Sequence, residues 1–342
     1  MHTDLARFHE SNLWSTPIRD LRLTIEGTRL EPILAEFMEE VRQAGITRVR
    51  PRFYLSTEWG VPFETVAIAI PFYLAHPDLT ALHAERVGHV EGFDRADILR
   101  YLRHEMGHVI NYAYRLYDHE EWVKQFGSIT QPYFEEYRPE PFSRRYVRHL
   151  PGWYAQKHPD EDWSETFAIW MTPGMDWRAE YGGWPVAYGK LTYCSRIMGE
   201  LRDQEPVVTS SELDEDVGDI EYSLDQYYGR SVDALGDLPP GLDGALRAIF
   251  DDLGSSDGRS PGALRPAADL IRRLEPELMA NIFRWTGHFP ERTRALLRYL
   301  AERAAQLEQG YPAEREDSAI MALTTLVTGL AMNHVQRGSY LP

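Results

Sequence analysis

Apolar residues recur every three or four positions along much of this chain, which is the spacing of helices with one buried face. Residues 31–45 show this pattern and end at Gly45, so we expect a helix there. Residues 46–56 and 64–76 are instead rich in β-branched and aromatic side chains and predict two strands. The second segment is apolar on both faces over residues 66–70, which indicates an interior strand.

Three more helices are predicted before residue 202. They cover residues 96–116, 160–171 and 188–201. The first has Asp94 as its N-cap, with Asp97 placed to reach back to the helix start. Between the first and second lies a segment, 127–159, that is crowded with Pro, Tyr and Arg and reads as a loop.

An acidic stretch then interrupts the pattern, because residues 212–225 hold seven acidic side chains among fourteen. Beyond it the periodicity is helical only. The helical segments lie near residues 243–253, 266–286, 290–308 and 315–335. We therefore expect an α+β domain over 1–208, an acidic linker over 209–240 and an all-helical domain over 241–342.

The composition narrows the choice of partner and compartment. A formal charge of −17 argues against nucleic acid and anionic membranes, because both attract a basic face. Cys194 is the sole cysteine, which excludes an intramolecular disulfide and a cysteine-rich zinc site. We see neither a secretory signal nor a run of about 18 apolar residues, so we expect a cytoplasmic protein that does not span a membrane. Any metal must then be held by His, Asp or Glu.

The helix predicted over 96–116 carries the letters HEMGH, an HExxH pattern. His104 and His108 are one turn apart on one face, so both imidazoles can reach one ion at about 2.0–2.1 Å. Glu105 is turned about 100° further round the helix, where it can take a proton from zinc-bound water. Gly107 lacks a side chain and would let another segment approach closely.

A catalytic zinc needs a third protein ligand, and the helix over 160–171 offers three carboxylates. Glu165 is the preferred choice, because it lies among apolar and aromatic residues where an unpaired carboxylate would be costly. Glu161 and Asp162 sit at the helix start, where the helix dipole favours acids in any case. Asp162 is also a candidate to orient a ligand histidine through its other ring nitrogen. His158 is a rival third ligand.

The segment RHEMGH at 103–108, followed by YAQKHPDEDWSETFA at 154–168, resembles a bacterial family of zinc-binding metallopeptidases. The stretch AIAIPFYLAHP at 67–77 is also similar to one common in that family. The resemblance covers about residues 50–200, whereas residues 226–342 match nothing that we recognise.

The resemblance implies a zincin-like fold of the gluzincin type, with a small sheet, an active-site helix and a glutamate-bearing helix. Carried over by position, its zinc ligands are His104, His108 and Glu165, with Glu105 as the base. The chain departs from many relatives after SETFA, where it has Ile-Trp in place of the His-Tyr that is frequent there. This difference leaves substrate preference open.

These observations predict a zinc metalloendopeptidase that acts on a protein or peptide. The oxyanion needs a donor beside zinc. The candidates are Tyr154, then His158, with Tyr181, Tyr188 and Tyr193 as further choices.

Strand 66–70 is a candidate to bind an extended peptide, although core packing explains it equally well. The domain over 241–342 is a candidate to bind a protein partner. The alternatives are a non-catalytic, zinc-stabilised interaction module and a hydrolase of a small amide.

Overall fold

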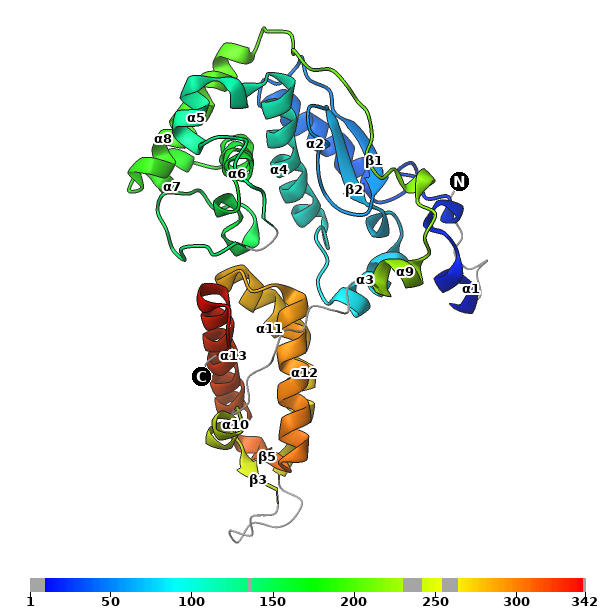
Figure 1. The fold of residues 1–342 in the computed structure, drawn as a ribbon, viewed down its shortest axis with the longest axis vertical. Helices are drawn as coiled ribbons and strands as arrows, with labels where there is room; N and C mark the ends of the chain where they lie inside the picture. The colour runs from blue at the N-terminus through cyan, green and yellow to red at the C-terminus, as the bar shows by residue number, and fades with distance from the viewer. Residues whose placement is uncertain (1–9, 135–136, 230–241, 254–263, 341–342) are drawn as a thin grey trace. The chain divides into compact units, whose positions relative to one another are not determined.

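Both parts of the chain combine helices and strands, so the fold is of the α+β class (Figure 1). The computed structural model describes residues 10–134, 137–229, 242–253 and 264–340. The chain divides into two units. The first takes in residues 1–86 and 90–230, and the second takes in 87–89 and 231–342.

A two-stranded parallel sheet lies in the interior of the first unit. β1 (Arg52–Ser56) pairs with β2 (Ala67–Pro71) and sets Tyr54 opposite Ala69. Every residue of β2 is buried, which confirms the predicted interior strand. The Ala69 amide donates to the Gly60 carbonyl at 2.8 Å. The chain itself therefore occupies the edge of β2 at Ala69, which favours core packing of this strand, and peptide binding along it stays a prediction.

Two helices beside the sheet confirm the predicted pattern. α2 (Leu30–Gln43) buries its apolar stripe, and α4 (Arg95–Ala113) packs against both α2 and β2. The Asp94 carboxylate accepts a hydrogen bond from the Asp97 amide at 2.8 Å, as expected of an N-cap. Asp97 accepts from the Gly92 amide at 2.8 Å, so it ties down the preceding loop.

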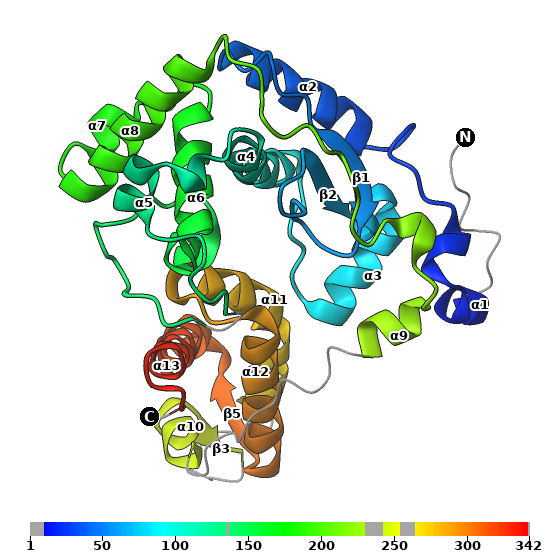
Figure 2. The ribbon, with the colours of Figure 1, turned by 45° about the horizontal axis from the view of Figure 1, so that its top comes forward.

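α6 (Pro159–Met171) and α8 (Pro185–Leu201) confirm the other two predicted helices of this part of the chain. α6 packs against both α4 and α8. Figures 1 and 2 show α4 between the strands and α6. The shorter helices before residue 230 are α1 (Glu10–Ser15), α3 (Pro77–Val87), α5 (Glu120–Phe126), α7 (Trp177–Tyr181) and α9 (Leu224–Gly229). α4 therefore lies at the centre of the core of the first unit.

The acidic stretch packs on the first unit. The Ser56 hydroxyl donates to the backbone carbonyl of Glu215 at 3.0 Å, and α9 follows within the same unit. Most of the acidic side chains there are exposed, which explains the composition without a free linker. The predicted linker over 209–240 is therefore wrong up to residue 229. Its remainder, 230–240, lies outside the described residues.

The second unit contains the four helices predicted for it. They are α10 (Asp243–Ile249), α11 (Ala267–Thr286), α12 (Pro290–Gln306) and α13 (Glu316–Arg337). It also contains a small antiparallel sheet, so the expectation of an all-helical domain is wrong. Its strands are β3 (Asp251–Asp252), β4 (Leu264–Pro266) and β5 (Gln309–Pro312), with β5 in the middle. These strands are two to four residues long and show no alternation of apolar and polar side chains that would predict them.

One segment of the described residues, Ala313–Arg337, is long and apolar enough to cross a membrane by length and composition alone. Leu323, Val327 and Leu330 of this segment are buried in the core of the second unit. A core helix meets the same criterion, so the segment is weak evidence of a membrane span, and the absence of such a span stays a prediction.

Candidate metal centre

α4 and α6 cross closely at Gly107 and Ser164. A Cβ atom at Gly107 would lie 2.7 Å from the Ser164 Cα, well inside the normal contact distance of two carbon atoms. The Trp163 indole nitrogen donates to the Gly107 carbonyl at 2.8 Å and joins the helices at the same point. The missing side chain therefore permits the close approach that the sequence predicted for this glycine.

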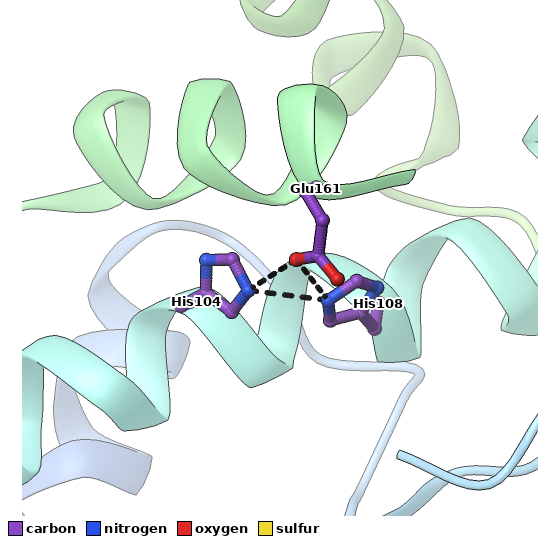
Figure 3. A group of neighbouring side chains, drawn as sticks. All are labelled: His104, His108 and Glu161. Carbon is purple, nitrogen blue, oxygen red and sulfur yellow. Dashed lines mark hydrogen bonds and ion pairs between the residues drawn. The ribbon is translucent and has the colours of Figure 1, made fainter. Parts of the chain in front are cut away.

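The crossing brings three ligand atoms together (Figure 3). The Nε2 atoms of His104 and His108 are 3.2 Å apart. Oε2 of Glu161 lies 2.9 Å from the first nitrogen and 3.3 Å from the second. Tetrahedral zinc with bonds of about 2.0–2.1 Å separates its ligand atoms by about 3.3 Å. The three residues therefore fit a zinc ion, and the cluster can hold a metal.

The surroundings of the cluster favour positive charge. His104 is 2 % exposed and Glu161 is 4 % exposed. Burial lowers the pKa of His104, but hydrogen bonds to Glu161 and Glu165 outweigh it and raise the pKa to about 9. Burial also opposes the charge on Glu161, yet His108 and His104 hold its pKa well below the ordinary value. A divalent cation can supply the positive charge in place of protons on the imidazoles.

Glu165 does not join the three ligand atoms, which corrects its assignment as a metal ligand. Its Oε1 lies 2.9 Å from Nδ1 of His104, on the opposite side of the ring from the cluster. Its Oε2 accepts from the backbone amides of His149 and Leu150, both at 2.8 Å. These three hydrogen bonds account for the fully buried carboxylate without a metal. Glu165 therefore lies behind one candidate ligand, and Glu161 is the carboxylate that joins the two histidines in the cluster that could hold a metal.

Asp160 lies beside the second histidine. Its Oδ2 forms an ion-pair contact of 3.0 Å with Nδ1 of His108, although that nitrogen makes no hydrogen bond of good geometry. The Asn111 amide donates to its Oδ1 at 2.7 Å, and the Tyr112 hydroxyl donates to its Oδ2 at 2.5 Å. Each imidazole therefore has its own carboxylate on the nitrogen that faces away from the cluster. Such partners fix the tautomer and the ring orientation of metal-binding histidines.

Asp162 does not orient a histidine, so this prediction is also corrected. Its Oδ2 forms a buried ion pair with the Lys190 ammonium at 2.5 Å. Lys190 comes from α8 and donates in addition to the Arg145 carbonyl at 3.1 Å. Asp162 follows Glu161 in sequence and is therefore turned to another side of α6, toward α8. The pair ties α6 to α8.

His158 is not one of the three candidate metal ligands. Its Nδ1 accepts from the Asp160 amide at 3.2 Å and caps the start of α6, while Nε2 lies 3.0 Å from the Gln131 carbonyl. Because both ring nitrogens are engaged by the backbone, His158 is neither the rival ligand nor the oxyanion donor that the sequence suggested. It anchors the loop before α6 instead.

Tyr154, the first candidate for the oxyanion donor, lies beside the candidate ligand His104. The centroid of its ring is 5.5 Å from that of His104, in an edge-on contact. Burial raises the pKa of Tyr154 well above its ordinary value, so its hydroxyl keeps its proton and can donate. The residue before it, Trp153, adopts a left-handed φ of 62°, which is costly for a bulky side chain and is often found near functional groups.

The other tyrosines considered for the oxyanion pack elsewhere. The Tyr181 hydroxyl accepts from the Arg148 amide at 3.1 Å, and Tyr188 packs against Trp177. Tyr193 makes edge contacts with core aromatic rings. Among the described residues, these three tyrosines therefore have their main contacts away from the candidate ligands.

Glu105 neighbours the cluster without contributing a ligand atom to it, as predicted for a base. Its side chain is buried, and this burial raises its pKa, with the charges of His104 and His108 acting in the opposite direction. A carboxylate whose pKa is raised toward neutrality is suited to accept a proton and return it. The position and environment of Glu105 therefore agree with the role expected for it.

The sequence predictions miss two residues of this site. They attribute Glu161 to the helix dipole and do not include Asp160. One signal points to Glu161: it lies four residues before Glu165, the same one-turn spacing that separates the two histidines. A pair of glutamates and a pair of histidines with the same one-turn spacing can face each other where two helices cross.

Comparison of this chain with models of known protein families, with curated proteins and with solved structures finds no match. The resemblance to zinc metallopeptidases therefore remains a prediction, and the geometry of the site carries the functional argument.

Proposed function

We propose that this chain is a zinc-dependent metallopeptidase of the gluzincin type, acting on a peptide or protein substrate. The observation that carries the proposal is the convergence of two imidazole nitrogens and the Glu161 carboxylate within 3.3 Å of one another. Glu105 accompanies them from the same helix as the histidines. A metal with three protein ligands and a neighbouring base is the arrangement of hydrolytic zinc sites.

The residues divide the chemistry among them. A zinc ion held here would polarise the scissile carbonyl and lower the pKa of a water molecule toward about 7. Glu105 accepts the proton of the attacking water and passes it to the leaving nitrogen, so that one water is consumed for each amide bond cleaved. Tyr154, which stays protonated, can donate a hydrogen bond to the developing oxyanion.

The test is Glu105→Gln, compared with Glu120→Gln at an exposed position on α5. Glu105→Gln should keep its zinc, measured by elemental analysis of the purified protein, and lose cleavage of a fluorogenic peptide library by about 10²- to 10⁴-fold. Glu120→Gln should keep both. Retained cleavage in Glu105→Gln would overturn the role of the base, and absence of bound zinc in the unaltered chain would overturn the proposal.

One observation favours a second function, a non-catalytic metal site that stabilises an interaction module. The three candidate ligands are all at least 93 % buried, since the most exposed of them, His108, is 7 % exposed. Such burial limits the access of water and substrate, which a catalytic zinc needs at an open coordination position. If this second function holds, metal removal should unfold the first unit, and no peptide should be cleaved. The low cysteine content supports a reducing cytoplasm as the compartment for either function.

A further inference from the structure

Tyr133 contacts the candidate ligand Glu161 from outside the two crossing helices. Its hydroxyl donates to Oε1 of Glu161 at 2.7 Å. The other oxygen of that carboxylate, Oε2, is the one that faces His104 and His108. The two oxygens of Glu161 therefore have different partners, one toward the metal cluster and one toward the loop between α5 and α6.

Several contacts hold the Tyr133 ring in this position. The Lys157 ammonium lies 4.4 Å from its centroid, and the ring of His158 lies 5.2 Å away. The Tyr154 hydroxyl is 3.4 Å from the Tyr133 hydroxyl. His158 also binds the Gln131 carbonyl, two residues before Tyr133. The segment that leads into α6 therefore fixes the loop that carries Tyr133.

We propose that Tyr133 is a positioning residue that limits Glu161 to a single metal–oxygen bond. This inference rests on the metal centre of the proposed function. A carboxylate can bind a metal through both oxygens and then fills two coordination positions. A hydrogen bond from Tyr133 engages Oε1, so that only Oε2 is free to bind. The second coordination position of the metal then stays open for water or substrate, as a hydrolytic site requires.

The test compares Tyr133→Phe with Tyr137→Phe. Tyr137 lies in the same loop, and its hydroxyl donates to the Gly152 carbonyl at 2.6 Å and not to Glu161. Each protein is stripped of metal and titrated with cobalt(II) against a chelator, and the visible absorption of the cobalt form is recorded. Tetrahedral cobalt absorbs strongly, and its bands weaken as the coordination number rises.

Tyr133→Phe should weaken cobalt binding by about 10- to 100-fold and reduce the intensity of the visible bands. Tyr137→Phe should match the unaltered chain in both readouts. Unchanged affinity and spectrum in Tyr133→Phe would overturn the role of Tyr133 while leaving the metal centre in place. If the unaltered chain binds no metal, both proposals fail. Because neither readout requires peptide cleavage, loss of the peptidase hypothesis alone would not affect this result.

Discussion

Glu161 and Glu165 lie one turn apart on α6 and contact opposite nitrogens of the same imidazole. Oε2 of Glu161 is 2.9 Å from Nε2 of His104, and Oε1 of Glu165 is 2.9 Å from Nδ1. One ring is therefore held between two carboxylates. The first faces the space where a metal can bind, and the second is fixed by backbone amides on its far side.

This arrangement predicts different outcomes for the two glutamates. Glu165→Gln should weaken zinc binding by about 10- to 100-fold, because it removes an orienting group and leaves the ligands in place. Glu161→Gln should weaken zinc binding by more than that, because it removes a ligand. Chelator competition on both purified proteins measures the dissociation constants. The reverse order of the two effects would restore Glu165 as the ligand.

Gly107→Ala should separate the two helices. The new Cβ would meet the Ser164 Cα at 2.7 Å, and a backbone atom cannot swing aside as a side chain does. We expect a loss of about 1–3 kcal/mol in the free energy of unfolding, measured by urea denaturation, together with weaker zinc binding.

The matched control for this variant is Gly189→Ala in the second turn of α8. Nothing lies within 4 Å of a Cβ atom at that position. It should be neutral or stabilise by up to about 1 kcal/mol, because alanine is the better helix former. Equal effects of the two substitutions would show that the close crossing is not what constrains residue 107.

Lys190→Met should destabilise the first unit by about 1–3 kcal/mol, because it leaves the buried Asp162 carboxyl group without its hydrogen-bond partner. Burial already raises the pKa of Asp162 to about 7, with Lys190 acting against this rise. The double variant Asp162→Asn with Lys190→Met should recover a large part of the loss. Denaturation midpoints at neutral pH measure all three proteins. No recovery in the double variant would indicate that Lys190 acts through packing alone.

Acid should selectively weaken the second unit through His288. Its ring nitrogens lie 2.7 Å from the Thr293 hydroxyl and 2.8 Å from the Tyr340 hydroxyl. Burial, with the nearby charges of His334 and Arg292, lowers the pKa of His288 to about 3. The unfolded chain therefore binds more protons between pH 6.5 and 3. The contribution of His288 is complete above pH 6.5 and is lost as the pH falls through this window.

The loss can reach about 5 kcal/mol at about 1.4 kcal/mol per pH unit. His288→Asn keeps a donor and an acceptor but cannot titrate, so it should remove this part of the pH dependence. Thermal unfolding of both proteins from pH 7 to pH 4 measures the difference. Identical slopes for the two proteins would exclude His288 as the titrating group.

Much of the site could be predicted from the sequence, because it depends on local periodicity. The one-turn spacing of His104 and His108 and the start of α4 at Asp94 follow from helix geometry and capping chemistry. The same is true of α6, because Pro159 at its start and the apolar residues that follow can be recognised in the local sequence. The choice between Glu161 and Glu165 is different, because both lie on one face of that helix. The position along α4 at which α6 crosses decides which glutamate faces both histidines. A single sequence does not reveal this position.

The partner of Asp162 and the short strands of the second unit could not be predicted for a similar reason. Asp162 could reach a histidine or a lysine, and only the packing of α8 against α6 shows that Lys190 is its partner. The sheet around β5 depends on pairings between segments that are distant in sequence. Local patterns predict helices well here because each helix carries its own hydrogen bonds, whereas a two-residue strand exists only through its neighbours.

The crossing at Gly107 has a consequence for protein engineering. Both imidazoles and the three acids beside them come from α4 and α6. A designed scaffold would therefore need two helices that touch at a glycine, with HExxH on one and DExxxE on the other, and backbone amides in the place of those of His149 and Leu150 to hold the second glutamate.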